Sequence, residues 1–411
     1  MHYDIRPIAP DEAGAFYRAD AAAFGYGKVT DAMVETWRPS LEFDRTLAAF
    51  EGDAVVGTAG AFSFELTLPG LTTVPVAAVS FVSVLPTHRR QGLLTALMGL
   101  QLHDVRERGE PLAVLTASEG AIYDRFGYGV ATVSAEHTLE RARATMRRDG
   151  APGRGAVRLV DEAEALKLIP AVHDRWRRTQ PGEVSRTPGF WEVAVAEDPL
   201  DEQKGSWFRA VHEGPGGPDA YAAYRVEPDW HHELASSRLT VDELCAVDAG
   251  AEAAMFSFLC GVDLVTQIRF ENRPLDDPLR WALADPRQLA CVRTRDWMWV
   301  RPVDAAAALA ARRYRVADRL TVDLADELCP WNPGRWVVEG GPDGATARPA
   351  RSGEEPDLAL GAPELGSVLL GGVAASALGR AGRIHELTPG ALDRADLFLG
   401  ANRPPWTMTA F

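Results

Sequence analysis

The residues best suited to chemistry lie in one run, Val82–Leu94, where an apolar strand meets Pro86 and a basic turn follows. The turn carries Arg89 and Arg90, and Gly92 precedes an apolar pattern at helical spacing. The free amides of a first helical turn and the helix dipole together favour an anion. Glycine lets the backbone approach that anion, and arginine adds charge-assisted hydrogen bonds. The run therefore predicts a pyrophosphate site, although an ordinary basic helix start fits the same pattern.

The same run resembles the acetyl-CoA signature of the GNAT N-acetyltransferases, Arg/Gln-x-x-Gly-x-Gly/Ala. This chain matches the signature at Arg89 and Gly92 and departs from it at Leu94, where that family has a small residue. A second run, Leu115–Gly129, has a strand that ends at Ser-Glu-Gly and a tyrosine in the next helical turn. Together the two runs resemble the Eis family (enhanced intracellular survival proteins). Those are three-domain GNAT enzymes that acetylate amines, including those of aminoglycosides.

The resemblance implies roles for single residues. The strand before the turn would line the pantetheine arm at a bulge, and the backbone N–H of Val84 would stabilise the developing oxyanion. Tyr123 would be the general acid that protonates the leaving thiolate, and the α-carboxylate of Phe411 would be the general base. The residues implied to hold acetyl-CoA, the co-substrate, are Val82, Ser83, Val84, Arg90, Gln91, Gly92, Leu93, Leu94, Thr95, Ser118 and Glu119.

Simpler explanations exist for some of these residues. Tyr123 has apolar neighbours and could be a core aromatic, and the last residue of a chain is usually frayed. The stretch 403–410 is apolar enough to dock, and the resemblance favours docking of the terminus. A glutamate such as Glu119 can act as a base in other acetyltransferases, whereas here a place at the edge of the co-substrate is expected.

The acceptor site is predicted from aromatic residues. Phe24, Tyr26 and Trp37 belong to the early helices that wall the acceptor site in this fold, and they would form a pocket suited to cations. The family often has an acidic residue in this segment, but residues 23–27 carry none. The nearby acidic candidates are Asp31 and Glu65. The resemblance therefore leaves the preference for aminoglycosides open.

The elements that must position these residues alternate between strand and helix patterns. In the first segment we expect helices near 11–24, 33–37 and 92–108, a helical turn at 121–126, and strands at 47–51, 54–64, 74–84, 111–117 and 129–139. The next segment repeats this plan, with helices at 163–180 and 251–259 and strands at 207–211, 220–226 and 237–247. It has no Arg-x-x-Gly element, so we expect a degenerate lobe that cannot hold CoA in the same way.

The last segment differs in character. An alanine-rich helix at 303–312 precedes strands at 319–323 and 335–339 and helices at 363–370 and 374–378. This order suggests a sterol-carrier-protein-like α/β module, which could hold a lipid or serve only as a scaffold. The predicted fold class is α+β, with two tandem GNAT-like lobes, the second degenerate, and this module. The predicted domains are 1–147, 148–295 and 296–411, with a linker rich in glycine, proline and arginine at 148–155.

Composition narrows the class of protein. The chain has 411 residues, of which 46% are hydrophobic and 25% charged, and no apolar run reaches the ~18 residues that a membrane span needs. The N-terminus shows no secretory signal pattern, and the four cysteines and nine histidines show no metal-ligand spacing. We therefore expect a cytoplasmic protein with reduced thiols and no metal. The net charge of −15 argues against nucleic-acid binding and suits cationic substrates, or simply solubility.

The expected activity is direct transfer of an acetyl group from acetyl-CoA to an amine of a small cationic molecule such as an aminoglycoside. The third domain would deliver Phe411 to the site. The resemblance implies a homo-oligomer, a hexamer. A protein lysine or a polyamine is an alternative acceptor, and a non-catalytic scaffold that binds CoA or lipid is an alternative class. The intact Tyr123, Gly92 and terminal carboxylate argue against the scaffold.

Overall fold

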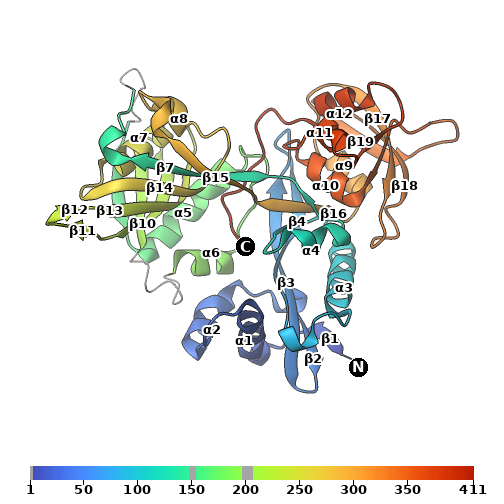
Figure 1. Cartoon of the computed structure of the whole chain (residues 1–411), viewed down its shortest axis with the longest axis horizontal. Coiled ribbons are helices and arrows are strands. Elements are labelled where there is room, and N and C mark those ends of the chain that lie inside the picture. Colours follow the sequence, from blue (N-terminus) through green and yellow to red (C-terminus); the bar gives the residue numbers. More distant parts are fainter. Residues whose placement is uncertain (1–2, 148–153, 197–206) are drawn as a thin grey trace. The chain divides into compact units, whose positions relative to one another are not determined.

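The computed structural model describes residues 3–147, 154–196 and 207–411. The predicted linker at 148–155 lies largely outside these residues. The chain forms two compact units, each with its own mixed sheet and covering helices (Figure 1). The first unit is built from Met1–Thr132, Pro181–Phe190 and Asp296–Phe411, and the second from Val133–Gln180 and Trp191–Arg295.

The main sheet of the first unit has the strand order β1-β2-β3-β4-β5-β16-β6. Strands β1 to β4 pair antiparallel, whereas β4 and β5 pair parallel, which requires a crossover, and α3 supplies it. The strands are β1 (Asp4–Pro7), β2 (Leu47–Glu51), β3 (Ala54–Thr67), β4 (Thr73–Val84), β5 (Leu112–Thr116), β6 (Gly129–Val130) and β16 (Met298–Pro302). The helices are α1 (Ala13–Phe24), α2 (Asp31–Trp37), α3 (Leu93–Glu107) and α4 (Gly120–Tyr123).

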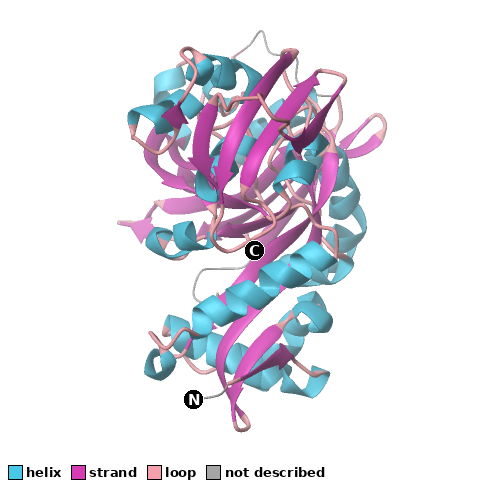
Figure 2. Cartoon of the chain, turned by 90° about the vertical axis from the view of Figure 1, so that its right-hand side faces the viewer, coloured by secondary structure: helices cyan, strands magenta, loops and turns pink. Residues whose placement is uncertain are grey.

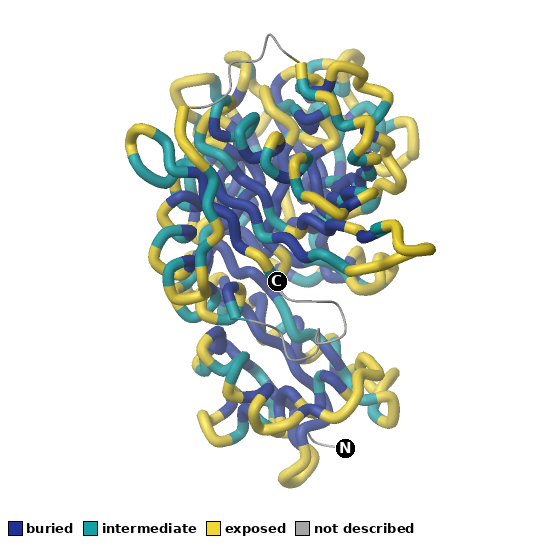
Figure 3. Tube along the Cα trace, turned by 90° about the vertical axis from the view of Figure 1, so that its left-hand side faces the viewer, coloured by how far each residue is buried: buried dark blue, intermediate teal, exposed yellow. Residues whose placement is uncertain are grey.

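Helices cover both faces of this sheet because side chains alternate along its strands. Ala48 and Phe50 of β2 pack in the cluster that α1 and α2 cover, whereas Ala49 packs against Leu93 and Leu97 of α3. The strands therefore lie between helices (Figure 2), and buried residues concentrate along them (Figure 3). This arrangement brings the end of α1 and the start of α3 to β4 from opposite sides.

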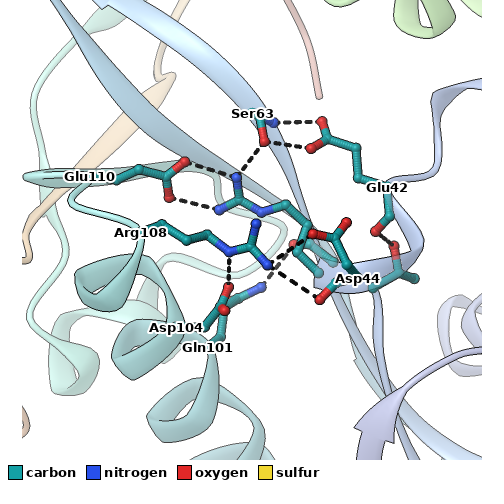
Figure 4. Close-up of polar contacts among 10 residues, drawn as sticks. Glu42, Asp44, Ser63, Gln101, Asp104, Arg108 and Glu110 are labelled. Atoms are coloured by element: carbon teal, nitrogen blue, oxygen red, sulfur yellow. Dashed lines mark hydrogen bonds and ion pairs between the residues drawn. The ribbon is translucent and has the colours of Figure 1, made fainter.

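A buried ionic network fixes the segment that leads into β2. The guanidinium of Arg45 donates to both carboxylate oxygens of Glu110, at 2.8 and 2.7 Å, and to the Ser63 hydroxyl at 2.7 Å (Figure 4). The backbone N–H of Ser63 donates to the Glu42 carboxylate at 2.7 Å. The network ties the 3-10 turn Phe43–Arg45 to β3 and to the residues just before β5.

The last part of the chain adds a five-stranded sheet, in the order β19-β18-β17-β20-β21, to the first unit. Its strands are β17 (Asp318–Ala325), β18 (Gly334–Gly341), β19 (Gly344–Pro349), β20 (Leu358–Gly361) and β21 (His385–Glu386), and its helices are α9 (Ala305–Ala311), α10 (Ala362–Leu369), α11 (Ala375–Arg380) and α12 (Ala391–Leu399). The cavity in the apolar core of this part measures only about 10 Å³, which is about the space of one water molecule. Its own side chains therefore fill the core.

The helix α10 joins this part to the main sheet through backbone contact. A Cβ atom on Gly366 would lie 2.1 Å from the Val300 carbonyl of β16, and one on Gly129 of β6 would lie 1.8 Å from the Pro363 carbonyl. Only residues without a side chain permit so close an approach. The buried residues of the two parts form one continuous hydrophobic cluster.

The second unit has the strand order β15-β7-β14-β13-β10-β9-β8. Its strands are β7 (Val133–Glu140), β8 (Ala156–Val160), β9 (Trp207–Gly214), β10 (Gly217–Glu227), β13 (Ser237–Ala246), β14 (Val265–Arg273) and β15 (Ala290–Asp296), with a small hairpin of β11 (Trp230–His231) and β12 (Leu234–Ala235). Its helices are α5 (Glu162–Arg177), α7 (Ala249–Gly261) and α8 (Leu279–Ala282), and α6 (Pro188–Val195) ends in it. No helix in the described parts of the chain is long and apolar enough to span a membrane.

The predicted strand 129–139 is two strands that join different sheets. The strand is interrupted at Ala131 and Thr132, whose amides both donate to the Met298 carbonyl. As a result, β6 pairs with β16 and β7 pairs with β14. A local pattern indicates that a strand forms but not which sheet it joins. The domain boundaries at 147 and 295 therefore stay a prediction.

Candidate active site

A cavity of about 720 Å³ opens in the first unit where β4 and β5 end. Ligand sites commonly lie at the carboxyl ends of parallel strands. Both basic residues and the glycine of the predicted pyrophosphate turn contribute to its wall. The lining residues are Ala23, Phe24, Val82, Ser83, Val84, His88, Arg89, Arg90, Gly92, Leu93, Leu94, Thr95, Ser118, Glu119, Ile122, Tyr123 and Arg125.

The cavity exists because β4 and β5 separate. Their parallel ladder joins only Val76–Ala78 to Leu112–Val114, although β4 continues to Val84. On its other edge, β5 pairs with β16 along its full length. The part of β4 beyond Ala78 therefore presents its edge to the gap.

A bulge in β4 reinforces the separation. Thr58 of β3 faces Ser83, whereas Gly60 faces Ser80, so two residues of β4 stand opposite one residue of β3. Phe81 lies in the bulge with a φ of 56°, a left-handed conformation that non-glycine residues rarely adopt. Such strain is often kept at functional sites. The predicted bulge before the basic turn is thus present.

The strand after the bulge turns polar backbone groups toward the gap. The N–H of Leu85 donates to Val56 of β3 at 3.0 Å, so the alternation of the strand directs the N–H of Val84 away from β3. The Val84 carbonyl also points away from β3 and accepts from Nε of Arg89 at 3.1 Å. The backbone of Val84 can therefore meet a ligand that lies between β4 and β5.

The N-terminus of α3 is open to an anion. Its N-cap residue is Gly92, with a φ of 82°, and within the described chain no side chain caps the helix. Arg89 anchors the turn, since its guanidinium also donates to the Ala23 carbonyl of α1 at 3.0 Å. Arg90 is exposed beside the cavity. Amides, dipole and guanidinium groups together suit a diphosphate.

The corresponding helix of the second unit, α7, starts differently. β13 leads into it with no basic turn, and the carboxylate of its N-cap residue Asp248 accepts from the backbone N–H of Ala251 at 2.9 Å. A negative side chain thus occupies the place where a phosphate would bind. This physical difference supports the predicted loss of CoA binding in the second lobe.

Tyr123 is buried at the wall of the cavity opposite the basic turn. Burial raises its pKa to about 12, and a hydrogen bond with Ser118 opposes that shift only in part. The phenol is therefore protonated at any physiological pH and can donate a proton or a hydrogen bond into the cavity.

The C-terminal segment is docked rather than frayed. Residues 406–409 are buried, and the Glu183 carboxylate accepts from the hydroxyls of Thr407 and Thr409, at 2.9 and 2.7 Å, and from the Met408 N–H at 2.6 Å. The terminal oxygen of Phe411 accepts from the Thr116 hydroxyl at 3.0 Å. Thr116 is the last residue of β5 and precedes Ser118 of the cavity wall by two residues. Phe411, which contacts Thr116, therefore lies near the cavity.

The structure brings most predicted site residues together. Phe24, Tyr123 and every residue implied to hold acetyl-CoA except Gln91 line the cavity, whereas Gln91 is exposed and accepts from the Tyr3 hydroxyl at 2.7 Å. Tyr26 is 63% exposed and lines a separate hollow, and Trp37 packs against Tyr17. The three predicted acceptor aromatics thus do not form one pocket.

Other aromatic residues lie between the bulge and the terminus, and they were not predicted. Ring contacts of 5.3–6.0 Å join Phe81 to Phe62, Phe62 to Phe64, and Phe64 to Phe411, and Phe190 contacts both Phe62 and Phe64. The spacing of Phe62 and Phe64 places both on one face of β3, which was the available sequence signal. We call these five residues the aromatic row: Phe62 and Phe64 are buried in the core, and Phe81, Phe190 and Phe411 are partly buried against it.

One polar residue was also missed. Asp20 of α1 lies one helical turn before Phe24 and faces the bulge, where the Thr58 hydroxyl donates to it at 3.3 Å. No group of three or more His, Cys, Asp or Glu residues in the described part of the chain could hold a metal ion.

Comparison with known proteins identifies the family of this chain. Residues 4–131 and 182–303 each match a family model of an acetyltransferase (GNAT) domain, and residues 305–408 match a sterol carrier protein domain. The chain is 40% identical over 417 residues to an uncharacterized N-acetyltransferase of Streptomyces avermitilis, with full coverage of both chains. It is 34% identical over 419 residues to N-acetyltransferase Eis of Mycobacterium tuberculosis, with 98% of each chain covered.

Solved structures give the same result. The crystal structure of Eis1 from Mycobacterium abscessus superposes with a TM-score of 0.87 at 35% identity and covers 99% of this chain and 100% of its own. A GCN5-related N-acetyltransferase from Anabaena variabilis reaches a TM-score of 0.85 at 17% identity, with full coverage of both chains, and shows the fold alone. The matches confirm the predicted fold class of two GNAT domains and a sterol-carrier-like domain.

Proposed function

Since the chain belongs to the Eis family of GNAT N-acetyltransferases, we propose that it transfers the acetyl group of acetyl-CoA directly to an amine of a small cationic molecule. Family membership confirms the resemblance stated from the sequence and makes the protein an acetyltransferase. Aminoglycosides are the first acceptor class to test. The observation that carries the proposal is the cavity, which joins an open helix N-terminus, a bulged strand and a buried phenol.

We propose that the cavity holds acetyl-CoA, the co-substrate. In the proposed pose the pyrophosphate meets the first turn of α3 beside Arg90, and the pantetheine arm pairs with the backbone of Val82–Val84. The gap between β4 and β5 supplies the room that this arm needs. The N–H of Val84 then donates to the thioester carbonyl oxygen as negative charge develops there.

We assign the proton donor to Tyr123, which protonates the thiolate that leaves. Its pKa of about 12 lies above that of a thiol, about 8.5. The phenol is therefore protonated at neutral pH, but proton transfer from it to a thiolate is unfavourable in free energy. A hydrogen bond that strengthens as charge develops on sulfur offsets this difference. The α-carboxylate of Phe411, held by Thr116, is the proposed base or ammonium anchor.

The acceptor is proposed to lie beside the partly buried members of the aromatic row, Phe81, Phe190 and Phe411. Aromatic faces attract cations, and the terminal carboxylate at the end of the row adds a negative charge. A polyamine or a protein lysine carries the same ammonium group and remains the alternative acceptor. From family membership we also propose a cytoplasmic homo-hexamer.

The test is thiol release from acetyl-CoA with three acceptor panels: aminoglycosides, polyamines and lysine peptides. The intact chain is compared with a variant extended by two residues after Phe411, which converts the terminal carboxylate into an amide. We expect turnover with one acceptor class and loss of most of it on extension. Turnover that the extension leaves unchanged would remove Phe411 from the mechanism, and no turnover with any amine would refute the proposed activity.

A further inference from the structure

Asp20 places a carboxyl group beneath the bulge of β4. The Thr58 hydroxyl lies 3.3 Å from Oδ1 of Asp20 and 2.7 Å from both the Ser83 hydroxyl and the Phe81 carbonyl. The Ser83 hydroxyl also hydrogen-bonds the Asp20 carboxylate. Three side chains from α1, β3 and β4 thus form one connected polar network at the strained part of the strand.

The Asp20 carboxylate has no cationic counterpart among the described residues. Only the Ser83 and Thr58 hydroxyls stabilise its charge, and no ion pair joins it to any residue that the structure describes. The titratable groups near it are the phenols of Tyr17, on α1 itself, and Tyr123, on α4. The groups facing it from β3 and β4 are hydroxyls and the Phe81 carbonyl, and no charged group of α2 affects it. Burial therefore raises its pKa to about 6.

The network reaches the cavity through Ser83. Ser83 and Tyr123 both line the cavity, and so does Phe24, which follows Asp20 by one turn on the same face of α1. A buried carboxylate without a cation lowers stability, so its retention beside a site points to a function. The missing cation matches the ammonium group that an amine acceptor brings.

We propose that Asp20 is a positioning residue that receives, through the Ser83 hydroxyl, the proton of the acceptor's ammonium. This inference rests on the proposed acetyl transfer to an amine. It adds a second carboxylate to the reaction, on the side of the bulge, whereas Phe411 lies at the end of β5. When the Ser83 hydroxyl donates to Asp20, its oxygen accepts from the Thr58 hydroxyl, and one lone pair remains for the substrate.

The protons balance. An N–H bond of the ammonium breaks as an O–H bond forms on Ser83, and the former Ser83 proton moves to Asp20. The amine lone pair attacks the thioester carbon, the C–S bond breaks, and Tyr123 protonates the sulfur. The second amine proton, acidified once the C–N bond forms, returns to the Tyr123 phenolate. The products are the amide and the CoA thiol, and the remaining proton leaves Asp20 for solvent.

The first variant is Asp20→Asn, which keeps the shape and the hydrogen bonds but cannot accept a proton. With an amine that the wild type acetylates, we expect kcat/KM to fall by about 10²-fold or more at pH 7.5, as for loss of a proton acceptor, with acetyl-CoA affinity unchanged. The wild-type profile should lose activity as the pH falls through about 6, and the variant should lack this acid limb. Asp53→Asn, in an exposed turn, is the matched control and should match the wild type.

Two further measurements separate this role from a structural one. Because the folded state binds the Asp20 proton more tightly than the unfolded chain, ionised Asp20 lowers stability above pH 6. Asp20→Asn should therefore raise the Tm at pH 8, and the gain should shrink as the pH falls through 6 toward 4. Ser83→Ala should also remove the acid limb, and the double variant should be no slower than the slower single variant.

The outcomes are decisive in either direction. An acid limb that survives in Asp20→Asn, or a Tm at pH 8 that falls below that of the wild type, would overturn the assignment. So would additive losses in the double variant. A wild type that acetylates no amine would instead refute the proposed function, and the two failures are therefore distinguishable.

Discussion

Burial keeps the phenol of Tyr123 protonated, and this property decides what the residue can do. A pKa of about 12 means that the hydroxyl donates and does not act as a base at neutral pH. The neighbouring ring of Tyr128, 6.0 Å away, is fully buried, and its hydroxyl has no partner among the described residues. The two neighbouring tyrosines thus differ, since Tyr123 lines the cavity and Tyr128 does not.

Tyr123→Phe should lower kcat by about 10² to 10⁴, because a general acid is lost, and should leave acetyl-CoA affinity unchanged. Tyr128→Phe is the matched control and should keep kcat, since it removes an unpaired hydroxyl. In the wild type, activity should not decline between pH 7 and 10 through loss of the Tyr123 proton, because that proton leaves only near pH 12. Steady-state kinetics over this range checks all three expectations, and equal losses in both variants would contradict the assignment.

The helices α3 and α7, which occupy corresponding positions in the two lobes, differ at the N-cap residue. α3 begins at Gly92 without a side-chain cap, as far as the described residues show, whereas α7 begins at Asp248 with one. The exposed N–H groups of α3 can satisfy a phosphate, and those of α7 already satisfy a carboxylate. The N-cap position thus distinguishes the lobe that we propose to bind acetyl-CoA from the second lobe.

Gly92→Asp should weaken acetyl-CoA binding by tenfold or more, since its carboxylate would repel the phosphates at the helix start. Gly92→Asn is the matched control: asparagine also tolerates a positive φ but is neutral, so it should bind more tightly than the aspartate variant. Asp248→Ala should lower stability by about 1 kcal/mol through loss of its cap and leave acetyl-CoA affinity unchanged. Isothermal titration with acetyl-CoA measures the affinities, and equal binding by both Gly92 variants would exclude a phosphate at this helix.

The network in Figure 4 predicts unequal effects for two carboxylates. Glu110→Gln leaves the buried guanidinium of Arg45 without a counter-charge and should lower the free energy of unfolding by about 3–5 kcal/mol. Asp104→Asn removes a partner of Arg108 at the surface and should change it by less than about 1 kcal/mol. Urea unfolding compares them, and similar effects would show that the buried pair is not the anchor of this segment.

The sequence predicted elements whose signals are local, and it missed features set by contacts between distant residues. The basic turn, Gly92 and Tyr123 carry their pattern within a few neighbours. The role of Asp20 depends on its contacts with β3 and β4, which are distant in the sequence. No local sequence pattern indicates those contacts. The exchange of β6 and β7 between sheets depends likewise on Met298, more than 160 residues later.

At the scale of the whole molecule, the sterol-carrier-like domain shares the core of the catalytic unit. α10 lies against β16 and β6 at backbone distance, and the apolar clusters are continuous. The cavity in the apolar core of this domain measures about 10 Å³. The domain's observed contribution is support of the main sheet and of the segment that ends at Phe411.

Gly366→Ala should lower the free energy of unfolding by about 1–3 kcal/mol, because the new methyl group would press on the Val300 carbonyl. Alanine is the better helix former, so the opposite sign is expected where space is free. Gly99→Ala in α3, with nothing within 4 Å of the new Cβ, should raise stability by about 0.5–1 kcal/mol. Thermal unfolding of both variants tests the contact, and a stabilising Gly366→Ala would refute it.

The closeness of α10 to β16 also limits how such enzymes can recombine. A chimera that takes its last hundred residues from a relative combines the relative's α10 with β6 and β16 of the first parent. These elements must contact each other with no side chain between them. Grafts joined near residue 304 should therefore succeed only between parents that both have glycine at the positions of Gly129 and Gly366. The sterol-carrier-like domain therefore cannot be exchanged on the basis of domain order alone, because its helix α10 must match the strands β6 and β16 that it contacts.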